Sequence, residues 1–411
     1  MSDDLVTTAC PLCGGPDRTP VWQHPGGVIN AVCDTCGHVF LARRASQAAI
    51  DAIYASYQQA YPRDFLIDPD NPVRRSARER WHQARPHLPD VPRRVLEIGC
   101  GYGFFLDALP CDTLRCGIEP SVTQSDFARQ DLGLDGVRCQ TLKAALAEGV
   151  WSKGFFDLIG SFHVIEHLPH PALLFEAAQD MLTQNGILFL ACPELRSVGH
   201  NVIELEYLAS SLHLQTFSAE RIISLAATHG FRTLTHYEER NQTPFPGSSH
   251  AFLFQRKPTT LDTTPQAPLD PGVAAAIAGA WHAEMAARCD RLQKDVAALH
   301  TAGHRIAVFG AGVHTQGLFH AAGLDPALIE GIIDDSVDKQ GQLLSGIPIR
   351  SLDATLAADA CDVILVSTLA SENRLLQNLP RRLPSHVRLI GLYRDIFGPP
   401  FATEPTVNAP Q

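Results

Sequence analysis

The sequence has little charge and no apolar run long enough to cross a membrane. Charged residues make up 19% of its 411 residues and hydrophobic residues 45%, a balance typical of a globular protein. Its first residues, Met1, Ser2, Asp3 and Asp4, also lack the basic start of a secretory signal peptide. We therefore expect a cytoplasmic protein that has no membrane partner.

Basic residues are scarce as well. The 33 Lys and Arg residues are outnumbered by 44 Asp and Glu residues, which gives a formal net charge of −11. Sequence-independent binding to nucleic acid depends on neutralising phosphates, so this balance argues against nucleic acid as a partner. The chain is too long for one ordinary hydrophobic core, and we expect two or three domains.

Four of the 11 cysteines form two closely spaced pairs near the N-terminus. Cys10 and Cys13 make one C-x2-C pair, and Cys33 and Cys36 make the second. The glycine after each pair suits a tight turn that directs two thiolates at one ion. Residues 1–45 are therefore predicted to be a zinc ribbon with a structural zinc ion, four free thiols being the alternative. The other cysteines lie scattered in apolar segments, which favours a reducing compartment.

The rest of the chain is organised around a short apolar run that ends in three glycines. Residues 95–98 are predicted to form a buried parallel strand, and Gly99, Gly101 and Gly103 follow at alternate positions. Glycine permits a sharp turn and lets a ligand approach the backbone closely. Residues 104–109 are predicted to form a helix whose N-terminus points at whatever binds to this turn.

Further predicted strands follow this glycine turn. Residues 114–119 end in Glu119, a carboxylate that can accept hydrogen bonds from both hydroxyls of a ribose. Residues 137–140 should form another strand. Residues 155–162 form the next and lead into a turn that bears histidines, and residues 186–193 form a strand after a helix over 171–182.

This set of strands and turns resembles the class I S-adenosylmethionine-dependent methyltransferases over residues 91–258. Its G-x-G-x-G spacing differs from the G-x-G-x-x-G of dinucleotide-binding proteins, which are the alternative. The resemblance implies S-adenosylmethionine as the cofactor. It also implies a set of cofactor-binding residues, namely Glu97, Gly99, Cys100, Gly101, Gly103, Glu119, Gln140 and His163. Gln140 stands where many members of the family have an acid that meets the adenine amine.

Residues 303–398 indicate a second, C-terminal α/β unit of Rossmann-like type. Its glycines have the spacing G-x-G-x4-G at Gly310, Gly312 and Gly317, which differs from the dinucleotide-binding pattern. We expect this domain to bind part of the substrate or only to pack, and not to carry out redox chemistry.

The remaining segments connect these domains. Residues 46–90 have helical spacing and are expected to form a helical connector. Residues 259–302 are expected to form a linker and a connecting helix, and residues 399–411 a disordered tail. The expected fold class is α/β, with a small N-terminal zinc ribbon, a class I methyltransferase Rossmann-like core and a second C-terminal Rossmann-like α/β domain.

The order of these domains resembles that of the sugar C-methyltransferases that act on nucleotide-activated keto-deoxysugars. The resemblance implies a small-molecule partner of the nucleotide-linked sugar class and a reaction through an enolate. A base must remove the proton beside the ketone, and the candidates are His213 and His167. The family has a Tyr-x-Glu-His stretch here, whereas this chain has Ser210, Ser211 and Leu212 before His213.

Three other functions stay open from the sequence. An O-methyltransferase of a sugar or natural-product hydroxyl needs a similar base but no enolate. An RNA methyltransferase could use the ribbon to hold RNA, although the acidic balance argues against it. A non-catalytic scaffold is disfavoured by the intact glycine turn and Glu119.

Overall fold

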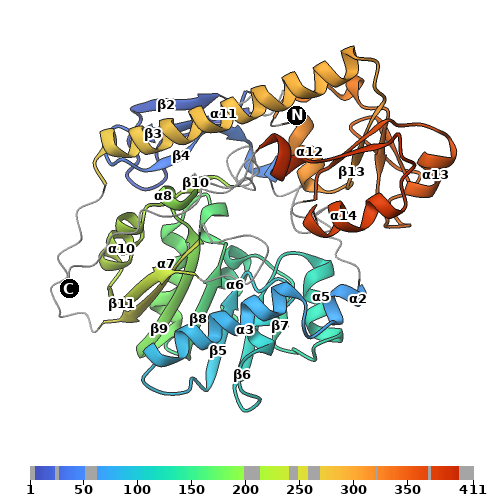
Figure 1. The fold of residues 1–411 in the computed structure, drawn as a ribbon. Helices are drawn as coiled ribbons and strands as arrows, with labels where there is room; N and C mark the ends of the chain where they lie inside the picture. Colours follow the sequence, from blue (N-terminus) through green and yellow to red (C-terminus); the bar gives the residue numbers. More distant parts are fainter. Residues whose placement is uncertain are drawn as a thin grey trace, which may run out of the picture. The chain divides into compact units, whose positions relative to one another are not determined.

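The computed structural model describes residues 5–23, 27–50, 63–198, 213–239, 249–257, 269–320, 322–368 and 372–397. The described residues form two compact units, one within 5–198 and 213–279 and the other within 280–397 (Figure 1). The predicted C-terminal tail and the stretch immediately before His213 lie outside the described residues.

The N-terminal ribbon is a small antiparallel sheet. Its strands are β1 (Leu5–Thr7), β2 (Arg18–Gln23), β3 (Ile29–Cys33) and β4 (Val39–Ala45), in the order β1-β4-β3-β2. A further strand, β10 (Gln215–Thr216), comes from much later in the chain and pairs with β4. The ribbon is thereby joined to a segment of the next domain.

The second sheet of the first unit has seven strands in the order β11-β12-β9-β8-β5-β6-β7. Its strands are β5 (Arg94–Ile98), β6 (Leu114–Ile118), β7 (Val137–Arg138), β8 (Phe156–Phe162), β9 (Leu182–Pro193), β11 (Phe231–Glu238) and β12 (Ser249–Arg256). The strands β5 to β9 run parallel, and β12 runs antiparallel to both of its neighbours. This is a Rossmann-like sheet with an antiparallel strand near one edge.

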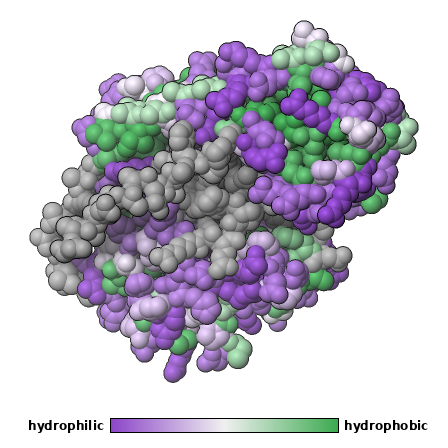
Figure 2. Space-filling view, in the orientation of Figure 1, coloured by the Kyte–Doolittle hydropathy of each residue, from purple (hydrophilic) through white to green (hydrophobic). Residues whose placement is uncertain are grey.

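Helices cover both faces of this sheet, because alternate side chains of its strands point to opposite sides. Leu96 and Ile98 belong to a core shared with α6, α7 and α10, whereas Val95 belongs to a core shared with α3, α4 and α5. The helices are α2 (Arg63–Ile67), α3 (Pro72–Ala84), α4 (Phe104–Asp107), α5 (Val122–Gln130), α6 (Leu142–Glu148), α7 (Ala172–Met181), α8 (Leu195–Val198) and α10 (Ala219–Thr228). The face of this unit that carries α3 is mainly hydrophilic (Figure 2).

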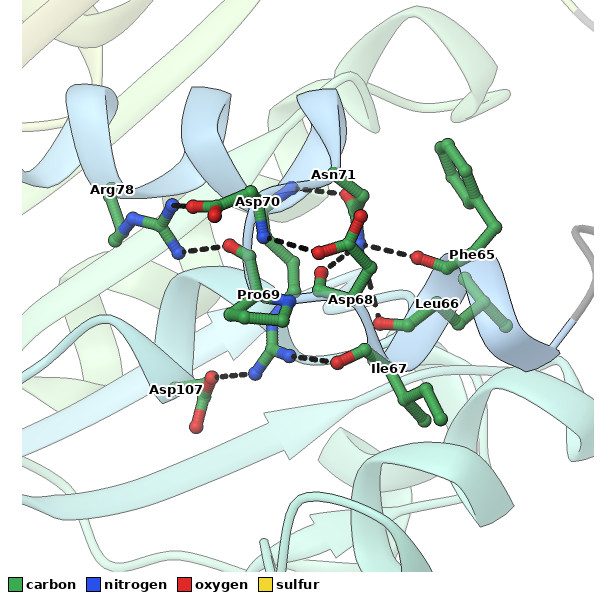
Figure 3. A network of polar contacts seen from close by, with 10 residues as sticks. Phe65, Leu66, Ile67, Asp68, Pro69, Asp70, Asn71, Arg78 and Asp107 are labelled. Carbon is green, nitrogen blue, oxygen red and sulfur yellow. Dashed lines mark hydrogen bonds and ion pairs between the residues drawn. The ribbon is translucent and has the colours of Figure 1, made fainter.

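A polar network fixes the start of α3 (Figure 3). Asn71 caps the helix through its side-chain oxygen, which accepts from the backbone N–H of Arg74 at 2.8 Å. Its amide nitrogen donates to the carbonyl oxygens of Phe65, Leu66 and Asp68. The Asn71 cap therefore links the start of α3 to the end of α2.

The second unit begins within the long helix α11 (Pro271–Thr301) and contains a six-stranded sheet. Its strand order is β15-β16-β14-β13-β17-β18. The strands are β13 (Ile306–Phe309), β14 (Gly331–Ile333), β15 (Leu343–Leu344), β16 (Ile347–Arg350), β17 (Val363–Val366) and β18 (Arg388–Gly391), and the helices are α12 (Val313–His320), α13 (Leu352–Ala357) and α14 (Glu372–Asn378). All pairs except β15 with β16 are parallel, so this unit is also Rossmann-like.

The structure confirms the predicted fold class. The strands expected at 95–98, 114–119, 155–162 and 186–193 are present with small shifts at their ends, whereas the strand expected over 137–140 ends at Arg138. Short or late strands such as β10 and β16 had no separate prediction. Among the described residues, none of the helices is both long and apolar enough to cross a lipid bilayer.

Candidate active site

The strand order predicts a ligand crevice at the carboxyl ends of β5 and β8. The chain leaves β5 for β6 on one side and returns later to β8 on the other side of β5. Connections on opposite sides of a central strand open a gap at its carboxyl end, where α/β proteins bind ligands. The glycine turn follows β5 and the histidine turn follows β8, so both turns lie at this edge of the sheet.

The glycine turn depends on backbone conformations that favour glycine. Gly99, Gly101 and Gly103 have φ angles of 72°, 54° and 80°. A Cβ at Gly99 would lie 2.3 Å from Cγ2 of Val164, and one at Gly103 would lie 2.5 Å from Cδ1 of Leu134. Two of the three glycines therefore make room for the protein's own side chains. A Cβ at Gly101 would have one neighbour within 4 Å, Oε1 of Gln124 at 3.3 Å. Gly101 therefore leaves the turn open to a ligand.

Glu119 connects the end of β6 to the glycine turn. Its Oε2 accepts a hydrogen bond from the backbone N–H of Gly101 at 2.9 Å, and its Oε1 accepts from Ser121 at 2.8 Å. Burial raises the pKa of Glu119, while these two backbone donors act in the opposite direction. Each carboxylate oxygen retains a second lone pair, so Glu119 can hold the turn and still accept from a ligand hydroxyl.

Two buried polar atoms near the turn lack hydrogen-bonding partners among the described residues. One is Oε2 of Glu97, whose side chain is 4% exposed, and the other is Nε2 of Gln140. Burial raises the pKa of Glu97 well above its usual value, and the charge of Glu119 raises it further. Such atoms rarely stay unpaired in native proteins, so they indicate a polar ligand. An ammonium and an adenine ring nitrogen, both present in S-adenosylmethionine, fit this donor and acceptor set.

Cys100 has a different environment from the other predicted cofactor residues. Its side chain is buried and packs toward Gly117, where a Cβ would lie 2.7 Å from its Sγ. Burial raises the pKa of this thiol well above its usual value, as do the charges of Glu97 and Glu119. Cys100 can therefore contribute to a ligand site only through its backbone.

His163 begins the second turn in a strained backbone conformation. Its φ is 57°, which is uncommon for a residue other than glycine. Its backbone N–H donates to the carbonyl of Ala191 at 2.8 Å, and its Nε2 lies 3.3 Å from Oγ of Ser249. Its Nδ1 lies 3.5 Å from Oε1 of Glu166. Neighbours on β9 and β12 thus hold the ring beside the crevice.

A buried ion pair supports this turn from the other side. Arg80 of α3 donates from Nε to Oε1 of Glu239 at 2.6 Å and from Nη2 to Oε2 at 2.9 Å. Oε2 also accepts from Oγ of Ser249 at 2.8 Å. Burial would raise the pKa of Glu239, but the charge and hydrogen bonds of Arg80 outweigh it and lower that pKa to about 2.

Three arginines of α3 contact neighbouring segments. Arg80 is buried with Glu239, and its guanidinium lies 4.3 Å from the centroid of the Phe162 ring. Arg74 pairs with Asp107 of α4, and Arg78 donates to the carbonyl of Pro69 (Figure 3). Through these contacts Arg74, Arg78 and Arg80 attach α3 to neighbouring segments of the chain.

The two predicted catalytic histidines lie against each other. The ring centroids of His167 and His213 are 4.4 Å apart, with an interplanar angle of 89°. The backbone N–H of Leu214 donates to the carbonyl of Glu166 at 2.9 Å, which aligns the two segments. Burial lowers the pKa of His213 well below its usual value, and the charges of His167 and His163 act in the same direction. His213 is therefore neutral at neutral pH.

The N-terminal ribbon sheet fixes the residues that follow His213. In the pairing of β10 with β4, Gln215 lies opposite Phe40 and Thr216 opposite Val39. His38 Nε2 lies 2.9 Å from Oε1 of Gln215, and the side-chain amide of Gln215 donates to the carbonyl of Leu168. The ribbon therefore helps to position His213, in addition to stabilising a short N-terminal segment.

The four paired cysteines lie close enough to share one ion. Cys10 Sγ lies 3.6 Å from Cys36 Sγ, and Cys13 Sγ lies 3.5 Å from Cys33 Sγ. Thiolates that bind one tetrahedral zinc ion lie about 3.8 Å apart, so the cluster fits this metal. The contact between Cys10 and Cys36 lowers the pKa of the Cys10 thiol and raises that of the Cys36 thiol, so without an ion the two sulfurs share one proton.

Several residues of this site had no prediction from the sequence. Arg80, Glu239 and Ser249 meet only after folding, since Arg80 and Glu239 are 159 positions apart. Glu166 adjoins His167. A buried acidic residue next to a histidine is a pattern that could have marked Glu166 in the sequence. No comparable local signal marks the other three.

Comparisons with known proteins agree with this geometry. Residues 73–236 match a family described as a methyltransferase domain, and residues 274–387 match one described as a C-methyltransferase C-terminal domain. A ubiquinone biosynthesis O-methyltransferase from Burkholderia pseudomallei is 29% identical over 37% of this chain and 65% of its own length. One from Paraburkholderia xenovorans is 27% identical over 40% of this chain and 71% of its own length. The chain thus spans about two thirds of the length of the curated relatives that it matches.

Solved structures with similar folds are also found. A SAM-dependent methyltransferase from Thermotoga maritima is 21% identical and covers 47% of this chain and 94% of its own, with a TM-score of 0.35. The family matches and the site geometry agree on the same segment of the chain. The chain therefore contains a class I S-adenosylmethionine-dependent methyltransferase domain, followed by a C-methyltransferase C-terminal domain.

Proposed function

We propose that this protein transfers a methyl group from S-adenosylmethionine to a carbon atom beside a ketone in a small molecule. The observation that carries this proposal is the pair of imidazoles, His167 and His213, beside the glycine turn. The match of residues 274–387 to a C-methyltransferase C-terminal domain favours carbon over oxygen as the methylated atom.

The cofactor site in this proposal is the crevice between the glycine turn and the His163 turn. Glu119 would accept from the ribose hydroxyls, Glu97 would pair with the amino group, and Gln140 would face the adenine. When bound, S-adenosylmethionine supplies an electrophilic methyl group attached to a sulfonium. The glycine turn would hold it through the backbone at Gly101, where the turn is open.

The acceptor class in this proposal is a nucleotide-linked keto-deoxysugar. A ketone makes the neighbouring C–H acidic, so a protein base can remove its proton and leave a nucleophilic enolate. The support comes from the C-terminal match and from the order of ribbon, methyltransferase core and Rossmann-like domain.

His213 is the proposed proton acceptor, with His167 next to it. A neutral imidazole has a free nitrogen lone pair, and burial keeps His213 neutral. The proton leaves the acceptor carbon for the imidazole, and the electron pair of the C–H bond passes into the enolate. The ribbon strand pairing that follows His213 would limit its movement during this step.

O-methylation is the second candidate function. The curated relatives that match the methyltransferase domain are named O-methyltransferases, although they cover only 37% to 40% of this chain. An acceptor hydroxyl would also lose its proton to an imidazole, but no enolate would form. The two functions therefore differ in whether hydrogen on the acceptor carbon exchanges with solvent.

We also propose that Cys10, Cys13, Cys33 and Cys36 bind one structural zinc ion. The thiol geometry supports this, and four thiolate ligands would leave no open coordination position. This ion would stabilise the ribbon and, through β4 and β10, the position of His213.

Hydrogen exchange in deuterium oxide tests the enolate reaction directly. Nucleotide-linked 4-keto-deoxysugars are incubated with the purified enzyme, with and without S-adenosylhomocysteine, and deuterium at the carbon beside the ketone is followed by NMR. We expect enzyme-dependent exchange that His213→Gln reduces by about 10²- to 10⁴-fold. Exchange that persists in this variant would contradict the base assignment, and turnover without exchange would favour O-methylation.

A further inference from the structure

Glu166, His167 and His213 bring one carboxylate and two imidazoles together, and we call them the carboxylate–imidazole cluster. One ligand atom from each residue lies within 4.8 Å of the others. Glu166 is buried, whereas His167 and His213 are partly exposed. The cluster therefore has a buried negative side and a side accessible from solvent.

The carboxylate of Glu166 lacks the partners that a buried charge requires. Its side chain is 0% exposed, and neither oxygen has a hydrogen bond within the described part of the chain. Among the described residues, the group at ion-pair distance that could carry a positive charge is His163. Its Nδ1 lies 3.5 Å from Oε1 of Glu166, without hydrogen-bond geometry. A buried carboxylate is costly unless a cation or several donors compensate it. This observation indicates a positively charged ligand.

The cluster is built on fixed backbone. Glu166 and His167 lie in the short 3-10 turn Ile165–His167, where the N–H of His167 donates to the carbonyl of Val164 at 2.9 Å. Leu214, the next residue after His213, donates to the carbonyl of Glu166 at 2.9 Å. These bonds fix the backbone that carries the three side chains.

The cluster also lies next to the predicted cofactor site. Val164 precedes it by two residues, and its Cγ2 would be 2.3 Å from a Cβ at Gly99. The turn that carries Glu166 and His167 therefore rests on the glycine turn. A ligand bound to the cluster would be adjacent to the crevice and not on a remote surface.

We propose that the carboxylate–imidazole cluster binds one divalent transition-metal ion. Two imidazoles and one carboxylate form a common ligand set for such ions and leave coordination positions open. Nitrogen and oxygen ligands of one zinc-like ion lie about 3.4 Å apart. The ligand atoms of the cluster lie within 4.8 Å of one another, and rotation of the side chains would bring them to this spacing. The four-cysteine cluster of the ribbon would remain a separate site, because soft thiolates select zinc whereas this mixed set also accepts manganese.

The bound ion would give the cluster a role in acceptor binding. An open position can take an oxygen of the acceptor, either a ketone or a hydroxyl, and polarise it as a Lewis acid. This role rests on the proposed methyl transfer, whereas metal binding itself does not. In the metal-bound form, His167 and His213 are ligands, and the proton-accepting role proposed for His213 belongs to the metal-free form alone.

Manganese titration tests the proposal without measuring activity. The full-length protein is washed with EDTA, its remaining zinc is measured, and Mn²⁺ is added while free Mn²⁺ is followed by electron paramagnetic resonance. We expect about one Mn²⁺ bound per chain in addition to the zinc. Glu166→Gln and His213→Gln should each weaken binding by at least about tenfold. His170→Gln removes an exposed histidine three residues beyond His167, and it should bind Mn²⁺ as the wild type does.

The outcomes separate this proposal from the proposed function. Wild-type protein that leaves added Mn²⁺ free would overturn the metal site, and so would equal binding by wild type, Glu166→Gln and His213→Gln. Retained binding in Glu166→Asp, which keeps a carboxylate, would support ligation and guard against misfolding of the glutamine variant. Methyl transfer in EDTA without Mn²⁺ binding would leave the function standing and reject the metal site. Mn²⁺ binding without methyl transfer would support the metal site and reject the proposed function.

Discussion

The carboxylate of Glu119 accepts a hydrogen bond from the backbone N–H of Gly101 at 2.9 Å. This bond joins the end of β6 to the one glycine of the turn whose missing side chain leaves space for a ligand. Glu119 therefore serves the site in two ways, because it fixes the turn and retains lone pairs for a ribose.

Replacement of Glu119 tests this double role. Glu119→Gln removes the charge and leaves one acceptor oxygen, so S-adenosylmethionine affinity should fall by about 2–3 kcal/mol, or about 30- to 150-fold. Isothermal titration calorimetry measures the change. Glu148→Gln is the matched control, since Glu148 is exposed at the end of α6. Equal affinity of Glu119→Gln and wild type would remove Glu119 from the cofactor site.

The Gly99–Val164 contact predicts a specific double-mutant result. Gly99→Ala combines a φ of 72° with a Cβ 2.3 Å from Cγ2 of Val164. The backbone strain alone costs about 1–2 kcal/mol, and the steric conflict adds to it. Val164→Ala removes the opposing methyl groups, so the double variant should recover part of the stability lost in Gly99→Ala. Thermal unfolding measures this, and strictly additive losses would show that the two turns do not press on each other.

The Arg80–Glu239 pair predicts a pH-dependent stability. The pKa of Glu239 is lowered to about 2 in the folded protein, below its unfolded value of about 4.3. The ion pair therefore contributes fully to the free energy of unfolding above pH 4.3. This contribution is lost as the pH falls towards 2, because Glu239 takes up a proton in the unfolded chain before it does so in the folded protein. A shift of this size corresponds to about 3 kcal/mol.

Urea unfolding of wild type and Glu239→Gln between pH 7 and pH 3 checks this expectation. At pH 7 the variant should lose about 3–5 kcal/mol, since Arg80 stays buried without its partner. The difference from wild type should shrink below pH 4.3. Asp180→Asn breaks the exposed pair with Lys153 and should change stability by less than about 1 kcal/mol. A difference that is constant with pH would contradict the assignment of the low pKa to Glu239.

Loss of the ribbon's zinc should impair the site as well as the ribbon. Cys13→Ser removes a ligand, and metal analysis should then find less than the roughly one zinc per chain expected of wild type. Because β4 pairs with β10 beside His213, methyl transfer should also fall. Cys111→Ser, which changes an exposed cysteine outside the cluster, should alter neither. Zinc content that is unchanged in Cys13→Ser would show that the four cysteines do not share an ion.

The sequence predicted the features that local pattern determines. Apolar runs marked β5, β6, β8 and β9, whose strands lie where the sequence predicts them. The glycine turn was predicted for the same reason, since its positive φ values require glycine.

The features that were missed depend on contacts between distant segments. Gln215 meets His38 across 177 positions, and Arg80 meets Glu239 across 159. A two-residue strand such as β10 has too little sequence to carry a pattern, so its pairing with β4 follows from the fold alone. That the Glu166 carboxylate has no hydrogen bond among the described residues is likewise visible only when the neighbouring side chains are placed.

The position of the transferred methyl group decides whether carbon or oxygen is the acceptor atom. The enzyme is incubated with S-adenosylmethionine labelled with ¹³C at the methyl group and with a nucleotide-linked 4-keto-deoxysugar, and the product is examined by two-dimensional NMR. We predict that the labelled methyl is bonded to the carbon beside the ketone. A labelled methyl bonded to oxygen would contradict C-methylation and favour the O-methyltransferase instead.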